Sequence, residues 1–549
     1  MLHARYRFIF YGSAFVAVGL IEWLRRLYPP VYWAYCFVLP FIFLGLRDIL
    51  QRKQAIRRNY PLLGRLRYLF EAIRPEINQY FVESDLDGRP FNREHRANVY
   101  QRAKKELNTR PFGTKLDVYK EGYEWVNHSI SPSHIHHSEP PRMLIGEARC
   151  TQPYSASLFN VSAMSYGALS KNAILALNAG AKLGGFYHNS GEGGLSPYHL
   201  NPGGDLVYQI GTGYFGSRDA EGRFSPEKFA ERSQYPSVKM IEIKLSQGAK
   251  PGHGGILPKK KITPEIAAIR HVPMDRDALS PPNHTAFTNP IELLEFVTQL
   301  RELSGGKPVG FKLCVGNDYE FLAICKAMLK TGLRPDFITV DGSEGGTGAA
   351  PMEFADFIGM PLTDGLVLVN NALIGCGLRD DIRVIASGKI TTGFHLARHI
   401  ALGADLCNSA RGMMFALGCI QALQCHSNTC PTGVATQDPY LVEGLDPNHK
   451  SVRVMQFHKE TIHSMLELVS ATGLTSVHGL TPHHIYRRVN QKITLRLEDL
   501  YPSLATGALL SEDGLEKLPE HWRNMWQRAW ALADAESFSP LTKETVLAR

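Results

Sequence analysis

Cysteine is scarce in this sequence of 549 residues, which contains only nine cysteines. Three of the nine, Cys419, Cys425 and Cys430, nevertheless lie within residues 419–430. Long low-complexity tracts and convincing short repeats are absent, which excludes a repeat or solenoid architecture. What is present, 44% apolar and 20% charged residues over this length, predicts a folded protein with a large core and more than one domain.

Two apolar stretches lie near the N-terminus, at residues 8–21 and 31–46, separated by EWLRRLYPP. Each is somewhat shorter than the roughly 20 residues that an untilted membrane span needs. A cleaved signal peptide and a buried core helix are the alternatives. No small-x-small cleavage site follows the first stretch, and aromatic residues gather at the ends of both stretches, as at membrane interfaces. We therefore predict a transmembrane helical hairpin over residues 1–50.

Positive charge flanks this hairpin on both sides. Arg5 and Arg7 precede it and five basic residues occur within residues 47–58, whereas the connecting loop has only Arg25 and Arg26. Positive flanks stay in the cytoplasm, so we expect a multi-pass protein of the inner (cytoplasmic) membrane with a cytoplasmic catalytic body. The formal net charge of +8 is then explained by the membrane surface, without a nucleic-acid partner. A reducing compartment disfavours structural disulfides, which leaves a metal or no role for the three clustered cysteines.

From about Leu158 onward, β-like runs alternate with Gly-rich turns and amphipathic helical segments, such as those at 170–184, 290–303, 318–332 and 392–403. Apolar runs followed by helices predict a parallel sheet, and seven or eight such units predict an α/β fold, a (β/α)8 TIM barrel. The alternative, a doubly wound sheet, lacks a GxGxxG sequence after an early strand. The expected strands are 158–164, 185–190, 238–245, 308–315, 336–342, 382–388 and 404–410.

Glycine-rich turns follow three late strands of this predicted barrel, as EGGTG at Glu344, ASGK at Ala386 and SARG at Ser409. Consecutive glycines let backbone N–H groups face an anion, and late barrel strands commonly carry phosphate sites. The three turns together predict a phosphorylated cofactor. Lys244 lies within an apolar strand, so it either points outward and snorkels between helices or faces inward toward an anion such as a reduced flavin.

Six motifs occur in the order seen in glutamate synthases: SAMSYGALS, NSGEGG, EIKLSQGAKPGHGG, SPPNH, EGGTGAAP and CHSNTCPTGVATQ. Over roughly Cys150 to Gln437 the chain resembles the FMN-binding barrel of their large subunit, and it looks like the stand-alone, membrane-anchored members. The sequence pattern predicts a helical and irregular lead-in over 51–150 and a C-terminal helical region over 441–549. The resemblance implies an FMN-binding (β/α)8 barrel with an iron–sulfur cysteine loop over 151–440.

The resemblance also implies roles for individual residues. Lys244 would sit beside the flavin ring with a catalytic role, and Glu192 would relay protons or order loops. Lys250 and Arg270 would bind the two carboxylates of 2-oxoglutarate, although the pattern PEIAAIR alone favours a surface helix for Arg270. The remaining flavin and phosphate contacts would be Ser162, Ala163, Met164, Ser165, Gln209, Gly345, Gly346, Ser387, Gly388, Ala410 and Arg411.

The three clustered cysteines match the family's ligands to a 3Fe-4S cluster. Their spacing differs from the CxxC pairs of zinc ribbons and fingers. A four-iron cluster with an open corner, or zinc with His426 as fourth ligand, is the alternative. The other cysteines are expected to be packing residues.

The sequence departs from the family pattern in three ways. It begins MLHARYRF instead of with the glutamine-hydrolysing cysteine, so we expect no glutaminase domain, and no C-terminal β-helix is expected either. Ile256 stands where the family has a glutamine beside the substrate, and His253 where it commonly has an acid. An apolar residue removes one hydrogen bond to a polar substrate, which weakens the choice of 2-oxoglutarate.

These features predict an oxidoreductase acting on CH–NH2 donors. It would form L-glutamate from 2-oxoglutarate and ammonia through 2-iminoglutarate, with a ferredoxin or a reductase subunit as electron donor. A related flavin oxidoreductase acting on another oxo acid or amine is the first alternative. An electron-relay subunit of a membrane complex is the second alternative, and the basic anchors Lys250 and Arg270 argue against it.

Overall fold

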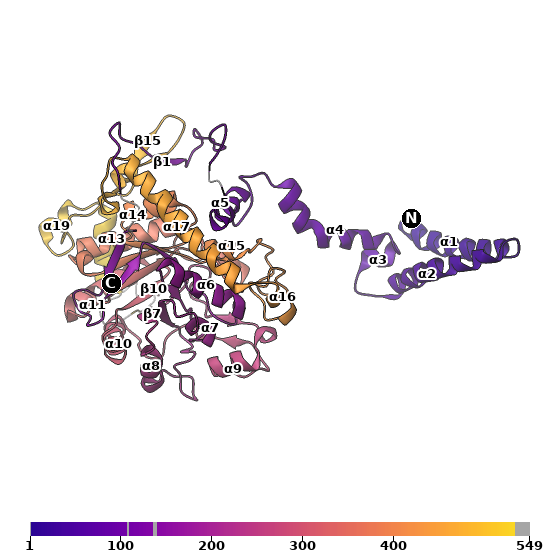
Figure 1. Ribbon diagram of the computed structural model, residues 1–549, viewed down its shortest axis with the longest axis horizontal. Helices are drawn as coiled ribbons and strands as arrows, with labels where there is room; N and C mark the ends of the chain where they lie inside the picture. Colours follow the sequence, from indigo (N-terminus) through magenta and orange to yellow (C-terminus); the bar gives the residue numbers. More distant parts are fainter. Residues whose placement is uncertain (1, 107–108, 136–139, 533–537, 539–549) are drawn as a thin grey trace. The chain divides into compact units, whose positions relative to one another are not determined.

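The computed structural model describes residues 2–106, 109–135, 140–532 and 538, and the chain forms two compact units, Met1–Glu94 and His95–Arg549 (Figure 1). The first unit is helical. Its elements are α1 (Leu2–Leu24), a 3-10 turn (Pro29–Ala34), α2 (Tyr35–Leu50), α3 (Ala55–Asn59), α4 (Gly64–Ile77) and a π turn (Asn78–Val82).

Two segments of the first unit, Tyr6–Leu24 and Pro29–Leu50, are long and apolar enough to cross a membrane, with mean hydropathies of 1.4 and 1.6. Most of their side chains are exposed, unlike those of a core helix. Two hydrogen bonds tie α4 to the end of α2, since the buried Asp48 in α2 accepts from Nε and Nη2 of Arg65 in α4, both at 2.8 Å.

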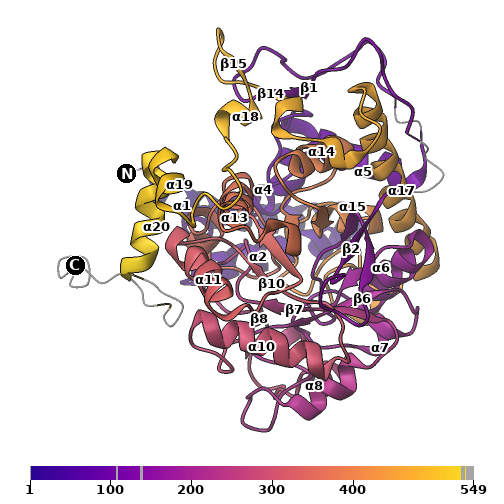
Figure 2. The same ribbon diagram turned by 90° about the vertical axis from the view of Figure 1, so that its left-hand side faces the viewer.

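The second unit is built around a closed barrel of eight parallel strands (Figure 2). Each strand pairs with the next one along the barrel, and β7 closes on β10 with Lys244 opposite Lys312. The predicted TIM barrel is therefore confirmed. The barrel strands are β4 (Phe159–Val161), β5 (His188–Asn189), β6 (Leu206–Ile210), β7 (Val238–Lys244), β10 (Val309–Leu313), β11 (Phe337–Asp341), β12 (Arg383–Ser387) and β13 (Leu406–Ser409).

The strand β6 was absent from the strands predicted from sequence. Its sequence LVYQI is short and follows a glycine pair, so the segment resembles part of a turn. All five of its residues are nevertheless buried. The other seven predicted strands match barrel strands. Because side chains alternate along a strand, β5, β6 and β7 each place a polar side chain inside the barrel. There Glu242 accepts hydrogen bonds from Asn189 and Gln209.

Helices surround the barrel, and local sequence signals define their ends. Ser170 caps α6 (Lys171–Gly184) by accepting a hydrogen bond from Ala173 N, and Asn289 caps α10 (Pro290–Leu303) in the same way. The outer helices also include α11 (Asp318–Thr331), α13 (Leu362–Gly375), α14 (Gly393–Ala401) and α17 (Pro447–Ala471), the last packing along α6.

Shorter helices and strands decorate the barrel and form its loops. The helices are α5 (Arg93–Lys104), α7 (Pro197–Leu200), α8 (Pro226–Ser233), α9 (Pro264–Arg270), α12 (Met352–Phe357), α15 (Arg411–Leu417), α16 (Pro439–Glu443), α18 (Leu497–Leu500), α19 (Glu512–Lys517) and α20 (Glu520–Leu532). The strands are β1 (Glu124–Val126), β2 (Arg142–Ile145), β3 (Tyr154–Ser157), β8 (Ile256–Leu257), β9 (Ala278–Leu279), β14 (Ile485–Arg488) and β15 (Thr494–Arg496).

Candidate active site

A lysine and a glutamate form an ion pair at the carboxyl ends of the early barrel strands. Lys244 is the last residue of β7, and its Nζ lies 2.7 Å from Oε1 of Glu192, in the loop after β5. Ser280 Oγ donates to the other carboxylate oxygen at 3.3 Å. Burial works to raise the pKa of the Glu192 carboxyl, but the charges of Lys244 and its neighbours Arg270 and Lys250 lower it below its usual value. Glu192 is therefore held as a carboxylate among cations.

Two glycines make this position possible for Glu192. A Cβ on Gly211 would lie 2.7 Å from Glu192 Oε2, and a Cβ on Gly255 would lie 2.3 Å from Oε1. Side chains at either position would push the carboxylate away from Lys244. These glycines, in the motifs QIGTG and GHGG, therefore allow the Glu192 carboxylate to lie close to their main chain.

Two further cations are buried beside this pair. Lys250 is 2% exposed, and its Nζ donates to the Ala349 carbonyl at 2.6 Å. Arg270, at the end of α9, is 4% exposed and donates to Ser165 Oγ at 3.2 Å and to the Tyr166 carbonyl at 2.9 Å. Burial lowers the pKa of Lys250 to about 8 and that of Arg270 to about 10. The surface-helix alternative for Arg270 is thus wrong, because α9 turns its last residue into the mouth of the barrel.

His284 forms a hydrogen bond with the main chain of Lys244. The sequence alone had given this histidine no role. Its Nε2 lies 2.9 Å from the Lys244 carbonyl oxygen and its Nδ1 lies 3.1 Å from the Tyr214 hydroxyl. Burial lowers the pKa of His284 to about 4, so the ring is neutral at physiological pH. The motif SPPNH, which contains this histidine, was the signal for it. His284 fixes the backbone at the end of β7.

Lys312 is a second lysine that sequence reasoning passed over. It lies on β10 directly opposite Lys244, is 4% exposed, and its Nζ lies 3.8 Å from Asp341 Oδ2. The signal was the same as for Lys244, a lysine inside the apolar strand VGFKL. Two buried lysines on neighbouring strands therefore face this end of the barrel, and Lys244 is the one closely paired with a carboxylate.

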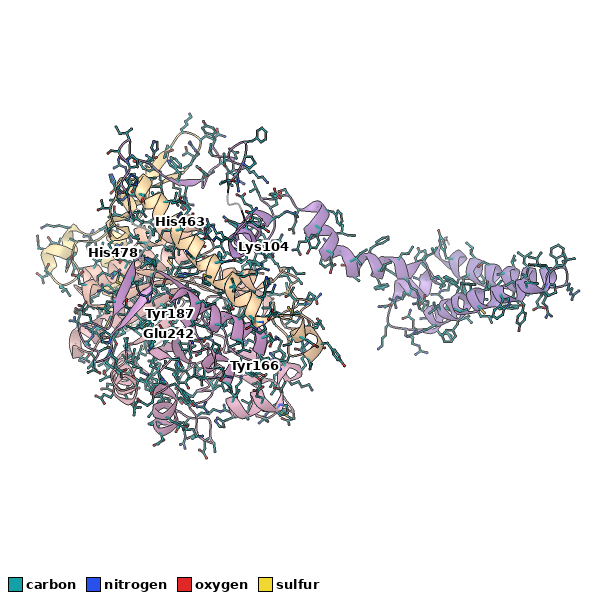
Figure 3. All side chains as sticks on the ribbon, in the orientation of Figure 1. Lys104, Tyr166, Tyr187, Glu242, His463 and His478 are labelled. Atoms are coloured by element: carbon teal, nitrogen blue, oxygen red, sulfur yellow. The ribbon has the colours of Figure 1, made fainter. Side chains whose placement is uncertain are left out.

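The side-chain amide of Gln209 is held by a buried carboxyl group, that of Glu242. Glu242 Oε1 accepts hydrogen bonds from Gln209 Nε2 and Asn189 Nδ2, both at 2.7 Å, and Oε2 accepts one from Thr339 Oγ1 at 2.6 Å. The buried Tyr187, labelled next to Glu242 in Figure 3, is close enough for the Glu242 charge to add to the effect of burial in raising its pKa. Glu242 thus fixes the position of the Gln209 side chain.

We expect Glu242→Leu to lower the free energy of unfolding by about 2–4 kcal/mol, because the buried side-chain amides of Gln209 and Asn189 would lose their acceptor. Urea denaturation followed by circular dichroism measures the change. Glu231→Leu, an exposed position on α8, is the matched control and should shift the midpoint little. Equal midpoints for the two variants would contradict the role given to Glu242.

The three glycine-rich turns meet at the ends of the late strands. Gly342 N donates to the Ser387 carbonyl at 2.8 Å, and Ser162 Oγ lies 3.4 Å from Ser387 Oγ. Arg411 Nη2 donates to the Glu344 carbonyl at 2.5 Å, passing so close to Gly346 that a Cβ there would lie 2.9 Å from the arginine side chain. Gly345, Gly388 and Ala410 belong to these turns, whereas Ser162, Ala163 and Met164 belong to the loop after β4, which meets the turns at Ser387.

The residues of these turns fit a phosphate. Glycine backbone, two hydroxyl groups and a guanidinium are a suitable set of donors for an anion. The one carboxylate in the turns, Glu344, is held at the start of α13, where its Oε2 accepts a hydrogen bond from Leu362 N at 2.9 Å, and its Oε1 would lie 3.4 Å from a Cβ on Gly388. Burial lowers the pKa of Arg411 to about 10, so its guanidinium keeps its charge at neutral pH.

The cysteine loop lies against the EGGTG turn. A Cβ on Gly348 would lie 3.6 Å from Cys425 Cβ, and Tyr100 on α5 donates to the Cys419 carbonyl at 2.6 Å. None of the nine cysteines forms a disulfide. Within the residues that the structure describes, no three His, Cys, Asp or Glu side chains converge on a point that would hold a single metal ion. A preformed zinc site with His426 is therefore not observed there.

Comparison with known proteins identifies the family. The family described as "Conserved region in glutamate synthase" matches residues 95–475. The chain belongs to the glutamate synthase family. The resemblance predicted from the six ordered motifs is thus confirmed, and the protein is a glutamate synthase-like oxidoreductase acting on CH–NH2 donors.

Relatives within the glutamate synthase family differ in how much of their length the chain covers. It is 38% identical over 497 residues to the glutamate synthase large subunit-like protein YerD of Bacillus subtilis, covering 83% of this chain and 94% of that protein. It is 37% identical over 322 residues to an archaeal glutamate synthase [NADPH] of Methanocaldococcus jannaschii, covering 58% of this chain and 60% of the relative. The chain thus spans less than two thirds of the archaeal enzyme.

Solved structures similar to this family member are more distant. Mandelate oxidase with benzoyl-formic acid has a TM-score of 0.41 and 15% identity, covering 73% of this chain and 98% of that one. The flavin-binding domain of baker's yeast flavocytochrome b2 has a TM-score of 0.40 and 13% identity, covering 71% of this chain and 78% of that domain. Neither likeness bears on ligand or reaction.

Proposed function

We propose that this chain forms L-glutamate by reductive amination of 2-oxoglutarate, with FMN and an iron–sulfur cluster as cofactors and an external electron donor. The observation that carries the proposal is the arrangement at the barrel mouth. There, two buried cations, Lys250 and Arg270, flank the Lys244–Glu192 pair. A dicarboxylate needs two fixed cations, and burying these side chains without an anionic ligand is costly.

In this proposal Lys250 and Arg270 bind and orient the substrate. The Arg270 guanidinium is fixed through Nη2, which donates to Ser165 Oγ and to the Tyr166 carbonyl, so its Nη1 group can donate to one carboxylate. Lys250 supplies a point charge for the other carboxylate. The carboxylate of Glu192 is acted on by the charges of these cations and accepts a hydrogen bond from Lys244 Nζ, so the pair can pass a proton toward the amine that forms at C2.

FMN would be held by its phosphate on the three glycine-rich turns, with Ser387, Gly388 and Arg411 as contacts and Gln209 and Lys244 facing the ring. When bound, it supplies the hydride for C2 of the imine formed from 2-oxoglutarate and ammonia. Lys312 joins Lys244 as a candidate partner for negative charge on the ring, because Glu192 already neutralises Lys244.

Cys419, Cys425 and Cys430 would ligate a 3Fe-4S cluster, which supplies one-electron transfer to the flavin. Three thiolates give one ligand to each iron, so they need not converge on a single point as zinc ligands do. Contact between Gly348 and Cys425 supports a cluster next to the flavin phosphate loop. Burial works to raise the pKa of Cys430, but the Thr432 hydroxyl and the main-chain N–H groups of Ala435, Thr432 and Val434 lower it below its usual value, as suits a thiolate ligand.

We further propose that α1 and α2 anchor the protein in the inner membrane with the barrel in the cytoplasm. Their length and composition and the basic flanks support this. The electron donor would be a ferredoxin or a reductase subunit. NADPH, which the names of the archaeal relatives specify, would act through such a partner.

An anaerobic assay tests the proposed reaction. Purified protein in which the flavin has been reduced receives ammonia and 2-oxoglutarate, and glutamate formation and flavin reoxidation are followed. We expect both together, and neither with ammonia or 2-oxoglutarate alone. Failure of the pair to reoxidise the flavin would remove the substrate while leaving the enzyme class in place.

The pH dependence of substrate capture should report Lys250. Because the pKa of Lys250 is lowered to about 8, the ammonium is lost as the pH rises through that value. We therefore expect kcat/KM for 2-oxoglutarate to fall about tenfold per pH unit above pH 8. In Lys250→Arg the charge persists, so this alkaline limb should disappear. An unchanged limb in Lys250→Arg would assign the titration to another group.

A second candidate is the same chemistry on a different oxo acid or amine. Ile256, at the start of β8 and next to Gly255 at the Glu192 carboxylate, favours it because an apolar side chain there offers no hydrogen bond. Screening oxo acids and amines against the reduced enzyme separates the two. The third possibility is an electron-relay subunit. It would be favoured if Lys250→Ala and Arg270→Ala left electron transfer to a partner intact and no substrate were found.

A further inference from the structure

One lysine of the run Lys259–Lys261 is buried although its two neighbours are exposed. The run forms a 3-10 turn after β8, and Lys261 is only 3% exposed. Its Nζ donates to the carbonyl of Ala168 at 3.0 Å. Among the described residues Lys261 forms no ion pair with a carboxylate. A buried ammonium with a single carbonyl acceptor is costly, which indicates that an anion belongs beside it.

The acidic groups that act most strongly on Lys261 are two of the clustered cysteines. Burial lowers the pKa of Lys261 to about 8, Cys425 and Cys430 oppose that shift, and Lys260 and Arg270 add to it. The structure also joins the two loops directly, because Asn428 Nδ2 donates to the Lys260 carbonyl at 3.3 Å. The uncompensated positive charge therefore lies beside the cysteine loop.

We propose that Lys261 is a positioning residue for the iron–sulfur cluster, whose negative charge it compensates so that the cluster accepts an electron more readily. This inference rests on the proposed function, since it needs the cluster on Cys425 and Cys430. The charge near a cluster is one of the main determinants of its reduction potential. The step concerned is the transfer of one electron from an external reductant to the cluster, with no bond made or broken.

Lys261 also connects the cysteine loop with the substrate loop. Its acceptor Ala168 belongs to the loop after β4, in which Ser165 and Tyr166 hold Arg270. The lysine run is thus bonded on one side to the cysteine loop, through the Lys260 carbonyl, and on the other to the loop that holds Arg270, through Lys261 Nζ.

The test uses the full-length protein, purified anaerobically, with iron, sulfide and FMN analysis followed by a dithionite redox titration monitored by electron paramagnetic resonance. For Lys261→Met and Lys261→Gln we expect the equilibrium constant for cluster reduction to fall about tenfold. For a one-electron couple this corresponds to about 59 mV toward negative potential. Lys261→Arg should keep the wild-type potential, and Lys259→Met, on the exposed neighbour, is the matched control.

The outcomes separate the inference from the proposed function. Wild-type potential in both neutral variants, or an equal shift in Lys261→Arg, would overturn the role of the charge while the cluster stands. Wild-type protein that holds flavin but no iron or sulfide would overturn the cluster and this inference together. If the methionine variant cannot be purified, the glutamine variant and the arginine variant decide the matter by the same comparison.

Discussion

Arg270→Lys is expected to lower kcat/KM for 2-oxoglutarate by roughly 100-fold, about 2.7 kcal/mol, while FMN and iron contents stay at wild-type values. The reason is geometric. Arg270 is fixed by two hydrogen bonds from its terminal nitrogen Nη2, to Ser165 Oγ and to the Tyr166 carbonyl. A lysine keeps the charge but has no planar fork, so it cannot satisfy these acceptors and grip a carboxylate at the same time.

Steady-state kinetics with a saturating electron donor measure this effect. The loss should appear mainly in KM if Arg270 contributes equally to substrate and transition-state binding, and in kcat if it orients the imine for reduction. Arg276→Lys, an exposed arginine six residues away, is the control and should be neutral. Wild-type kcat/KM in Arg270→Lys would remove Arg270 from the substrate site.

Cys425→Ser is expected to lower donor-dependent turnover by at least roughly 1,000-fold, because serine is a poor ligand for iron and the cluster would be lost. Cys425 adjoins the EGGTG turn at Gly348, so the loss of this ligand would break the proposed link from the cluster to the flavin phosphate loop. FMN should remain bound, since none of the proposed phosphate contacts is altered.

Iron and sulfide analysis together with the flavin absorbance spectrum distinguish the two cofactors. Cys36→Ser, at an exposed position on α2, controls for the loss of any thiol and should retain full iron content. Full iron content in Cys425→Ser would contradict the ligand assignment. Loss of FMN together with iron would show that the cysteine loop is needed to shape the phosphate site.

Much of the fold could be predicted from the sequence. Strands of a parallel barrel are buried on both sides, so each appears as a continuous apolar run, and seven of the eight were recognised on that basis. The exception, β6, is five residues long and lies between glycine-rich turns. Its type and length are ambiguous locally, and only pairing with β5 and β7 defines it as a strand.

The pairings within the site were beyond prediction. Glu192 and Lys244 are 52 positions apart, and Arg270 and Ser165 are 105 positions apart. Such pairs depend on the closure of the barrel, which brings the ends of different strands to one face. Glu242 shows the same limit, because its three hydrogen bonds come from strands β5, β6 and β11. Nothing in the local sequence IEIK distinguishes this glutamate from an exposed one.

The sequence by itself determined the order of the six motifs, the barrel class, the two apolar N-terminal segments and the residue types available at the site, because these depend on local composition and spacing. Only the tertiary structure decided that Arg270 is buried and bonded to the loop after β4, and that Lys244 forms an ion pair with Glu192. It also decided that Lys261, alone in the run Lys259–Lys261, is buried next to the cysteine loop. Those properties arise from contacts between distant segments, and the free energy of burying a charge depends on which groups the fold places around it.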